Sequence, residues 1–135
     1  MENQAVIYIV DDDDSVLRSL RRLIKSAGFV VETFTSAESF LQTGHPREKG
    51  CLILDIQLPG INGLDLQEKL ASAHCKLPII FITARTDTAS QVRALAAGAV
   101  AFLFKPVDDQ VLLDGINAAL NPSTPIKLEN GLGKE

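Results

Sequence analysis

The sequence predicts an α/β protein with a doubly wound, five-stranded parallel sheet of strand order 2-1-3-4-5. Five short apolar runs alternate with five segments in which apolar residues recur at helical spacing, the pattern of consecutive strand–helix units. The first, third and fourth runs are apolar on both faces, as interior strands must be, whereas the second carries Glu32 and Thr33 and fits an edge. Right-handed crossovers then favour this order, with a crevice between the first and third strands, where the winding reverses.

The first two strands are expected at Ala5–Val10 and Phe29–Phe34. Gly28 ends the helix between them. The apolar face of that helix consists of Val16, Leu20, Leu23, Ile24 and Ala27. A short second helix follows and stops at Gly44 and Pro46. The residues able to cap these two helices are Asp13 or Asp14 for the first and Ser36 for the second.

The remaining strands are expected at Cys51–Asp55, Pro78–Thr83 and Val100–Lys105. The fifth strand should be the second edge of the sheet, yet its sequence VAFLF is apolar on both faces. Edge strands are usually blunted by charge, so we expect this one to be partly covered or to serve as a partner surface. The caps of the three following helices are Asn62, Asp87, and Asp108 or Asp109.

Composition limits the classes of function. With 135 residues, 46% of them hydrophobic, the chain has room for one domain, predicted at 1–120, and the Pro-, Gly- and charge-rich residues 121–135 read as a linker or disordered tail. The apolar runs are too short to cross a bilayer, and the amino terminus lacks signal-peptide features. We therefore expect a cytoplasmic protein with no membrane partner, in which Cys51 and Cys75 stay reduced. The net charge of −4 argues against nucleic acid binding by this segment.

Polar residues follow four of the apolar runs where strands should end. Asp11 and Asp12 follow the first run, Asp55 the third, Thr83 closes the fourth, and Lys105 closes the fifth. The carboxyl ends of parallel strands open on one edge of the sheet, so these groups should converge there. Carboxylates gathered in one crevice repel one another unless a cation lies among them, and hard oxygen ligands favour Mg2+. The acids of the run Asp11–Asp14 cannot all be ligands, and the residues alone leave open which of them binds metal.

This constellation, and its order along the chain, resembles the CheY-like receiver domain of bacterial two-component response regulators, in the FixJ/NarL-type branch, and the likeness covers about residues 4–120. The resemblance implies a flavodoxin-like fold and a sensor histidine kinase that phosphorylates Asp55. It implies that Mg2+ is bound by Asp12 directly, by Asp11 through water, by Asp55 and by the backbone carbonyl of Gln57. Lys105, after which the bond to Pro106 would be cis, and the Thr83 hydroxyl would hold phosphoryl oxygens.

The resemblance also implies how the signal leaves the domain. The chain would be a phosphoacceptor signalling domain that catalyses only its own phosphorylation and slow dephosphorylation. Phe102 would swing inward when Thr83 moves toward the phosphoryl group. The fourth helix, fifth strand and fifth helix would form the signalling face, which would also serve a phosphorylation-dependent homodimer. Output would be control of transcription through a further DNA-binding domain or a partner.

Two other functions remain open. Haloacid-dehalogenase-type phosphatases also use a strand-end Asp and Mg2+, but they need a second Asp two residues later, where this chain has Gln57, which neither donates nor takes a proton at neutral pH. A phosphorylation-independent interaction module would have lost an acid or the lysine, and both are kept. The resemblance also implies that Gln57 and Arg85 flank the path of the water that hydrolyses the phosphoryl group, and both are long enough to obstruct it; the alternative is that both point to solvent. His45 and His74 read as surface residues.

Overall fold

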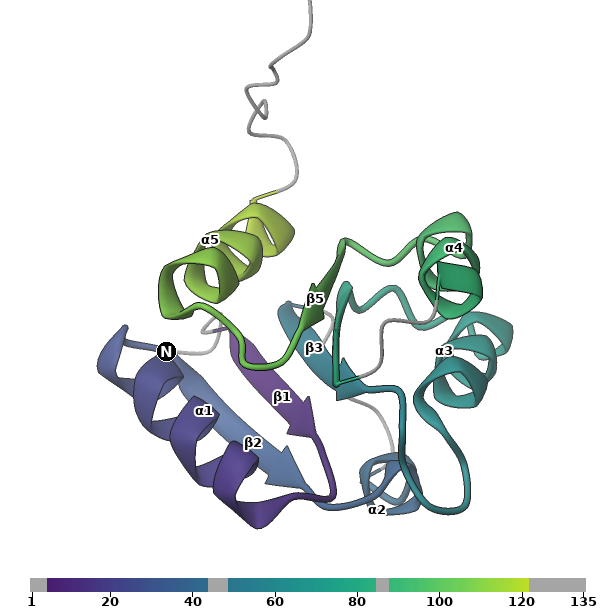
Figure 1. Ribbon diagram of the computed structural model, residues 1–135, viewed down its shortest axis with the longest axis horizontal. Coiled ribbons are helices and arrows are strands. Elements are labelled where there is room, and N and C mark those ends of the chain that lie inside the picture. Colours follow the sequence, from purple (N-terminus) through teal and green to yellow (C-terminus); the bar gives the residue numbers. More distant parts are fainter. Residues whose placement is uncertain (1–4, 44–48, 85–87, 122–135) are drawn as a thin grey trace, which may run out of the picture.

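The computed structural model describes residues 5–43, 49–84 and 88–121. In this part of the chain, five parallel strands form one sheet in the order β2-β1-β3-β4-β5, which confirms the predicted fold class (Figure 1). The strands are β1 (Val6–Val10), β2 (Val30–Phe34), β3 (Gly50–Asp55), β4 (Ile79–Thr83) and β5 (Ala101–Phe104). The helices are α1 (Asp14–Ser26), α2 (Ala37–Leu41), α3 (Gly63–Ser72), α4 (Thr88–Ala96) and α5 (Asp109–Leu120).

Helices cover both faces of the sheet, with α1 and α5 on one face and α2, α3 and α4 on the other (Figure 1). Alternate residues of each interior strand point to opposite faces, so Ile7 and Ile9 of β1 belong to the core under α1 and α5. Tyr8 and Val10 belong to the core under the other three helices. This double burial explains why the interior strands are apolar throughout.

The helix caps agree with the sequence and decide two alternatives that it left open. Asp13, and not Asp14, caps α1, because its carboxylate accepts hydrogen bonds from the backbone of Ser15 and Val16. Asp108, and not Asp109, caps α5 through the backbone N–H of Val111. Ser36 and Asn62 cap α2 and α3 as predicted, while Asp87, Gly44 and Pro46 lie outside the described residues.

The strand bounds differ from the predicted ones by about one residue. The strands β1, β2, β4 and β5 begin one residue later than predicted, β3 begins one residue earlier at Gly50, and β5 ends at Phe104. Backbone pairing nevertheless continues past several of these ends. The Pro78 carbonyl accepts a hydrogen bond from Leu52 at 2.8 Å, although proline itself has no N–H to donate. Lys105 N–H donates to the Thr83 carbonyl at 2.8 Å, so the lysine is held as an extension of β5.

The edge strands have different surroundings. The polar strand β2 is an edge, as predicted. The other edge, β5, is partly covered by its flanking helices, because Phe102 is buried and Ala101 and Leu103 are half-buried. Phe104 at its end is exposed, as is Val100 just before its start.

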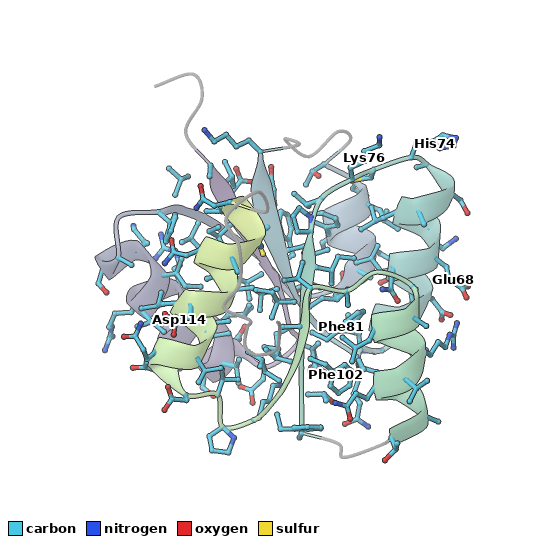
Figure 2. All side chains as sticks on the ribbon, turned by 90° about the horizontal axis from the view of Figure 1, so that it is seen from above. Glu68, His74, Lys76, Phe81, Phe102 and Asp114 are labelled. Carbon is cyan, nitrogen blue, oxygen red and sulfur yellow. The ribbon has the colours of Figure 1, made fainter. Side chains whose placement is uncertain are left out.

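The positions of Cys51, Cys75 and His74 agree with the sequence, which predicted packed, reduced cysteines and a surface histidine. Cys51 is fully buried in β3, and burial raises the pKa of its thiol to about 12, so it stays protonated. Cys75 is half-buried, and both cysteines are free thiols. His74 is exposed just after α3, pointing outward beside Lys76 (Figure 2), and His45 lies outside the described residues. Among the described helices, none is both long enough and apolar enough to cross a membrane.

Candidate phosphoacceptor and metal site

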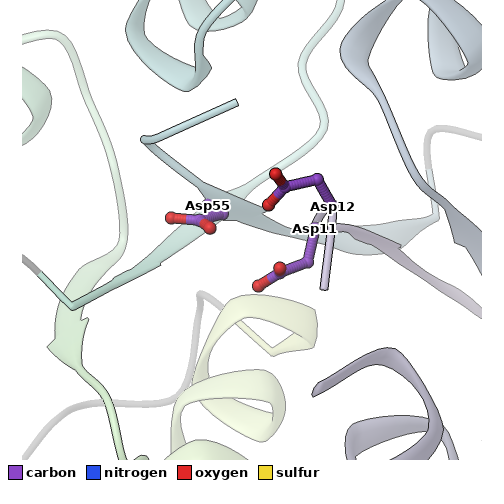
Figure 3. A group of neighbouring side chains, drawn as sticks. All are labelled: Asp11, Asp12 and Asp55. Carbon is purple, nitrogen blue, oxygen red and sulfur yellow. The ribbon is translucent and has the colours of Figure 1, made fainter. Parts of the chain in front are cut away.

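Three carboxylates meet at the carboxyl edge of the sheet. Asp11 and Asp12 follow β1, Asp55 ends the neighbouring strand β3, and their side chains gather at one point (Figure 3). One oxygen from each lies within 4.8 Å of the others. Asp11 and Asp55 are buried, whereas Asp12 is exposed. The predicted acids therefore meet at the carboxyl ends of β1 and β3, where the sequence predicts the crevice.

Backbone hydrogen bonds fix the two buried carboxylates. Asp11 N–H donates to the Phe34 carbonyl of β2 at 3.1 Å, and the Asp11 Oδ1 accepts from Asp13 N–H at 2.9 Å. Asp55 Oδ1 accepts from Gln57 N–H at 3.2 Å. Each of these buried acids thus uses one oxygen for local backbone and leaves its Oδ2 for the crevice.

The start of α3 lies directly against the backbone of Asp55. Gly63, the first residue of the helix, is buried, and a side chain there would collide with the Asp55 carbonyl oxygen and the Ile56 Cα. Gly63 N–H donates to the Ile56 carbonyl at 2.9 Å. Only glycine permits this close approach, which folds the loop 56–62 back over the carboxyl edge of the sheet.

Lys105 joins the two buried carboxylates. Its Nζ lies 2.8 Å from Asp11 Oδ2 and 3.2 Å from Asp55 Oδ2, and the Lys105–Pro106 peptide bond is cis as predicted. Burial by itself lowers the pKa of Lys105, but the charges and contacts of Asp11 and Asp55 outweigh burial and raise it. The lysine therefore remains a cation inside the site.

Burial and a neighbouring like charge disfavour the ionised form of Asp55. Burial raises its pKa, and the nearby charge of Asp11 raises it further. The charge and hydrogen bond of Lys105, and the Gln57 N–H, act in the opposite direction but do not cancel the rise. The ionised Asp55 is thus a carboxylate whose charge is incompletely compensated by the protein.

Thr83 ends a strand at the same edge of the sheet as the acids, and Phe102 lies in the core. Thr83 ends β4, the strand next to Asp55, and is buried. Phe102 points into the core and packs against Phe81 with ring centroids 6.0 Å apart (Figure 2). Gln57 is exposed at the rim, and Arg85 lies outside the described residues.

The residues of this site fit Mg2+. The close partner of the buried Asp11 Oδ2 among the described residues is the Lys105 ammonium, which Asp11 shares with Asp55. One ammonium group does not neutralise three carboxylates, so the charge of the site favours a further cation. Three carboxylates with one side open to solvent match an ion that takes few protein ligands and keeps several waters.

The chain matches the family model of the response regulator receiver domain over residues 7–117. It is a member of that family. The receiver is 47% identical to Nodulation protein W of Bradyrhizobium diazoefficiens over 116 residues, which cover 86% of this chain and 51% of that protein. It is 37% identical to the transcriptional regulatory protein FixJ of Azorhizobium caulinodans, over 91% of this chain and 58% of that protein.

A solved structure shows the same architecture. The response regulator StyR matches with a TM-score of 0.81 at 47% identity, over 88% of this chain and 60% of that one. These relatives place the receiver with FixJ-type response regulators, and they lend no support to the phosphatase alternative. The chain spans little more than half the length of the curated relatives it matches.

Sequence reasoning missed Glu38. Its Oε2 accepts a hydrogen bond from Ile61 N–H, in the loop that follows Asp55, at 3.0 Å. The two residues are 23 positions apart, and a glutamate in the first turn of a helix is ordinarily explained by the helix dipole. No local pattern in the sequence signals this contact.

Proposed function

We propose that this receiver accepts a phosphoryl group on Asp55 from a sensor histidine kinase in the cytoplasm, in a Mg2+-dependent reaction. The observation that carries the proposal is the arrangement of Asp55 itself. It is a buried strand-end carboxylate with one oxygen turned to the crevice, beside two further acids and a lysine. Its charge is incompletely compensated, which favours reaction with an electrophilic phosphorus atom.

In the transfer, an Asp55 carboxylate oxygen forms a bond to the phosphorus of a phosphohistidine. The phosphorus–nitrogen bond breaks and its electron pair stays on the imidazole nitrogen, while a proton on the other ring nitrogen makes the departing kinase histidine neutral. Catalysis of this kind depends mainly on positioning and on charges held ready around the phosphoryl oxygens. The domain would catalyse this step, and slow loss of the phosphoryl group, only upon itself.

Lys105 is the residue that must change partner. In the structure its ammonium group lies against Asp11 and Asp55. The phosphoryl oxygens on Asp55 would offer it a stronger anionic partner, and the buried hydroxyl of Thr83 on the adjacent strand would hold another oxygen. When Mg2+ is bound, its charge neutralises the negative charge that develops on these oxygens.

The metal would be held by Asp12 directly, by Asp11 through water, by Asp55, and by the backbone carbonyl of Gln57. The exposed position of Asp12 and the buried, hydrogen-bonded position of Asp11 support this division. Oxygen ligands in this number are typical of Mg2+.

The signal would leave through α4, β5 and α5. Thr83 pairs with Phe104 of the adjacent strand β5, and the ring of Phe102 packs against Phe104 and Phe81, so movement of Thr83 would alter the packing of Phe102. Apolar side chains are exposed on all three elements of this face, at Val92, Leu95, Val100, Phe104 and Val111. A phosphorylation-dependent homodimer formed through this face would cover them.

The domain at 1–120 would act on a downstream partner or on a DNA-binding domain joined through 121–135. The FixJ relative is a transcriptional regulatory protein, and the receiver covers 58% of it. Control of transcription is therefore the output we propose, with no contact between this segment and nucleic acid.

The test is phosphoryl labelling. Acetyl phosphate with Mg2+ should add one phosphoryl group to the wild-type domain, measured by intact mass, and chelation should prevent it. Asp55→Asn should give no labelling, because the amide nitrogen and oxygen cannot replace the carboxylate nucleophile. Asp14→Asn, which removes an exposed acid of α1 outside the crevice, is the matched control and should label normally. Labelling of Asp55→Asn at the wild-type rate would overturn the proposal.

A further inference from the structure

The loop that follows Asp55 is tied to α2 by a hydrogen bond to the side chain of Glu38. Glu38, in the first turn of α2, accepts the Ile61 backbone N–H on its Oε2 at 3.0 Å. Both residues are half-buried. The same contact lowers the pKa of Glu38, so the acceptor stays ionised at neutral pH and the hydrogen bond is assisted by charge.

The remainder of the loop 56–62 is fixed at its two ends. Gly63 N–H closes the carboxyl end onto the Ile56 carbonyl, and the buried side chains of Ile56 and Leu58 hold the amino end in the core. Gln57 lies between these anchors and is exposed. The hydrogen bond from Ile61 to Glu38 ties the part of the loop before α3 to another element, α2.

Gly60 makes this contact sterically feasible. Its φ of +74° is in the region that favours glycine, and Pro59 precedes it, as in a type II turn. A Cβ at this position would meet Glu38 Oε2. Because Gly60 has no side chain, the Glu38 carboxylate can approach the backbone of the turn closely. The contact holds the loop against α2.

We propose that Glu38 is a positioning residue for the metal site, acting through the loop that carries the Gln57 carbonyl. This inference rests on the proposed Mg2+ site. A ligand carbonyl on a loop that is held at both ends and at Ile61 needs no ordering when the ion binds, whereas a carbonyl on a loose loop must be ordered at that moment. Loss of the Glu38 contact therefore weakens Mg2+ binding while leaving the three carboxylates in place.

The experiment compares variants of the full chain by Mg2+ titration, using calorimetry, and by amide hydrogen exchange. Glu38→Ala removes the acceptor and the charge. Glu38→Gln removes the charge and keeps an oxygen that accepts the Ile61 N–H. Glu32→Ala removes the same charge from an exposed site on β2 and is the matched control.

Glu38→Ala should weaken Mg2+ binding by on the order of tenfold, the usual cost of losing a residue that orients a ligand. Its Ile61 amide should exchange faster with solvent even without Mg2+. Glu38→Gln should retain most of the affinity and the protection, and Glu32→Ala should match wild type. Gly60→Ala should weaken binding in the same direction as Glu38→Ala, because its methyl group would displace the carboxylate.

Three outcomes would overturn the proposal. Equal affinities for wild type and Glu38→Ala, with wild type binding normally, would remove Glu38 from the site and leave the proposed function intact. A Gln variant as weak as the Ala variant would make the effect one of charge and not of the hydrogen bond. Absence of Mg2+ binding by wild type would overturn both the metal site and the role of Glu38.

Discussion

Keeping Asp55 ionised in the folded domain costs free energy, and its hydrogen-bond and ion-pair partners offset this cost only in part. It is buried, it lies beside the Asp11 carboxylate, and its pKa is raised by burial first and by that charge second. Lys105 lies 3.2 Å from it but is shared with Asp11. Active sites commonly keep such strain because the strained group is the one that reacts.

We expect Asp55→Asn to stabilise the metal-free domain at pH 7, raising its Tm by several degrees. The substitution removes a buried charge, preserves the side-chain volume, and leaves Lys105 its partner Asp11 at 2.8 Å. Thermal unfolding in a chelator measures the difference. The matched control is Asp65→Asn. Asp65 is half-buried in the first turn of α3, away from the three acids, and its substitution should change the Tm little.

The pH dependence of that difference follows from the direction of the pKa change. A carboxyl whose folded-state pKa is raised destabilises the fold fully above that raised pKa, because only there is it ionised in both states. The penalty declines as pH falls through the raised pKa and disappears below the ordinary value of 3.8, where both states bind the proton. The advantage of Asp55→Asn should therefore shrink with falling pH. An advantage that grows toward low pH would contradict the burial argument, and excess Mg2+ should favour wild type instead.

We expect Gln57 to affect how long the phosphoryl group remains. Hydrolysis needs a water in line with the bond from Asp55 to phosphorus, and Gln57, exposed two residues later, is long enough to obstruct that water. Gln57→Ala should lose its phosphoryl group several-fold faster than wild type, with labelling still occurring, as followed by intact mass after the donor is removed. Arg85→Ala and the double variant complete the series. Unchanged rates in all three would exclude a gate at these positions.

The helices α3 and α4 are held together by an uncommon buried contact. Gln67 of α3 is buried, and its Nε2 donates to the Ala94 carbonyl of α4 at 3.0 Å. Next to it, the exposed Glu68 pairs with Arg93 at 2.7 Å. Ala94 is the buried residue of α4 among those described, so a small set of contacts sets the position of this helix.

Gln67→Ala should therefore destabilise the domain by about 1–2 kcal/mol, through the lost hydrogen bond and the space left behind. Glu68→Ala is the matched control, because an exposed ion pair contributes only about 0–1 kcal/mol. Urea unfolding compares the two. If Glu68→Ala costs as much as Gln67→Ala, α4 is held by its surface and not by the buried amide.

The elements differ in how far local sequence could predict them. Interior strands were recognisable because both faces are buried, and caps such as Asp13 because a short side chain bonds to its own helix. Contacts between helices distant in sequence, such as Gln67 with Ala94 and Glu38 with Ile61, have no local signature. The acidic crevice was predictable because parallel strands end on one edge, but the sharing of Lys105 between Asp11 and Asp55 depends on side-chain geometry that spacing does not contain.

Across the whole domain, the reacting edge and the signalling face are joined through β4 and β5. Thr83 pairs with Phe104 in the sheet, and Phe102 packs on Phe81 from β4 (Figure 2). The face beyond them exposes Val92 of α4, at 61%, Phe104 of β5, at 39%, and Val111 of α5, at 49%. A monomer that leaves apolar groups exposed on three adjoining elements is suited to self-association.

Beryllofluoride with Mg2+, a mimic of the phosphoryl group, should convert the wild-type domain from monomer to dimer, measured by sedimentation velocity over a range of protein concentrations. Val92→Glu should keep the variant monomeric, because its charge would be desolvated in an interface formed by α4 and β5. Val30→Glu, at an exposed position on β2 at the far edge of the sheet, introduces the same charge outside that face and should dimerise like wild type. A wild-type domain that stays monomeric would contradict the proposed dimer, and loss of dimer in Val30→Glu but not in Val92→Glu would move the interface to the β2 edge.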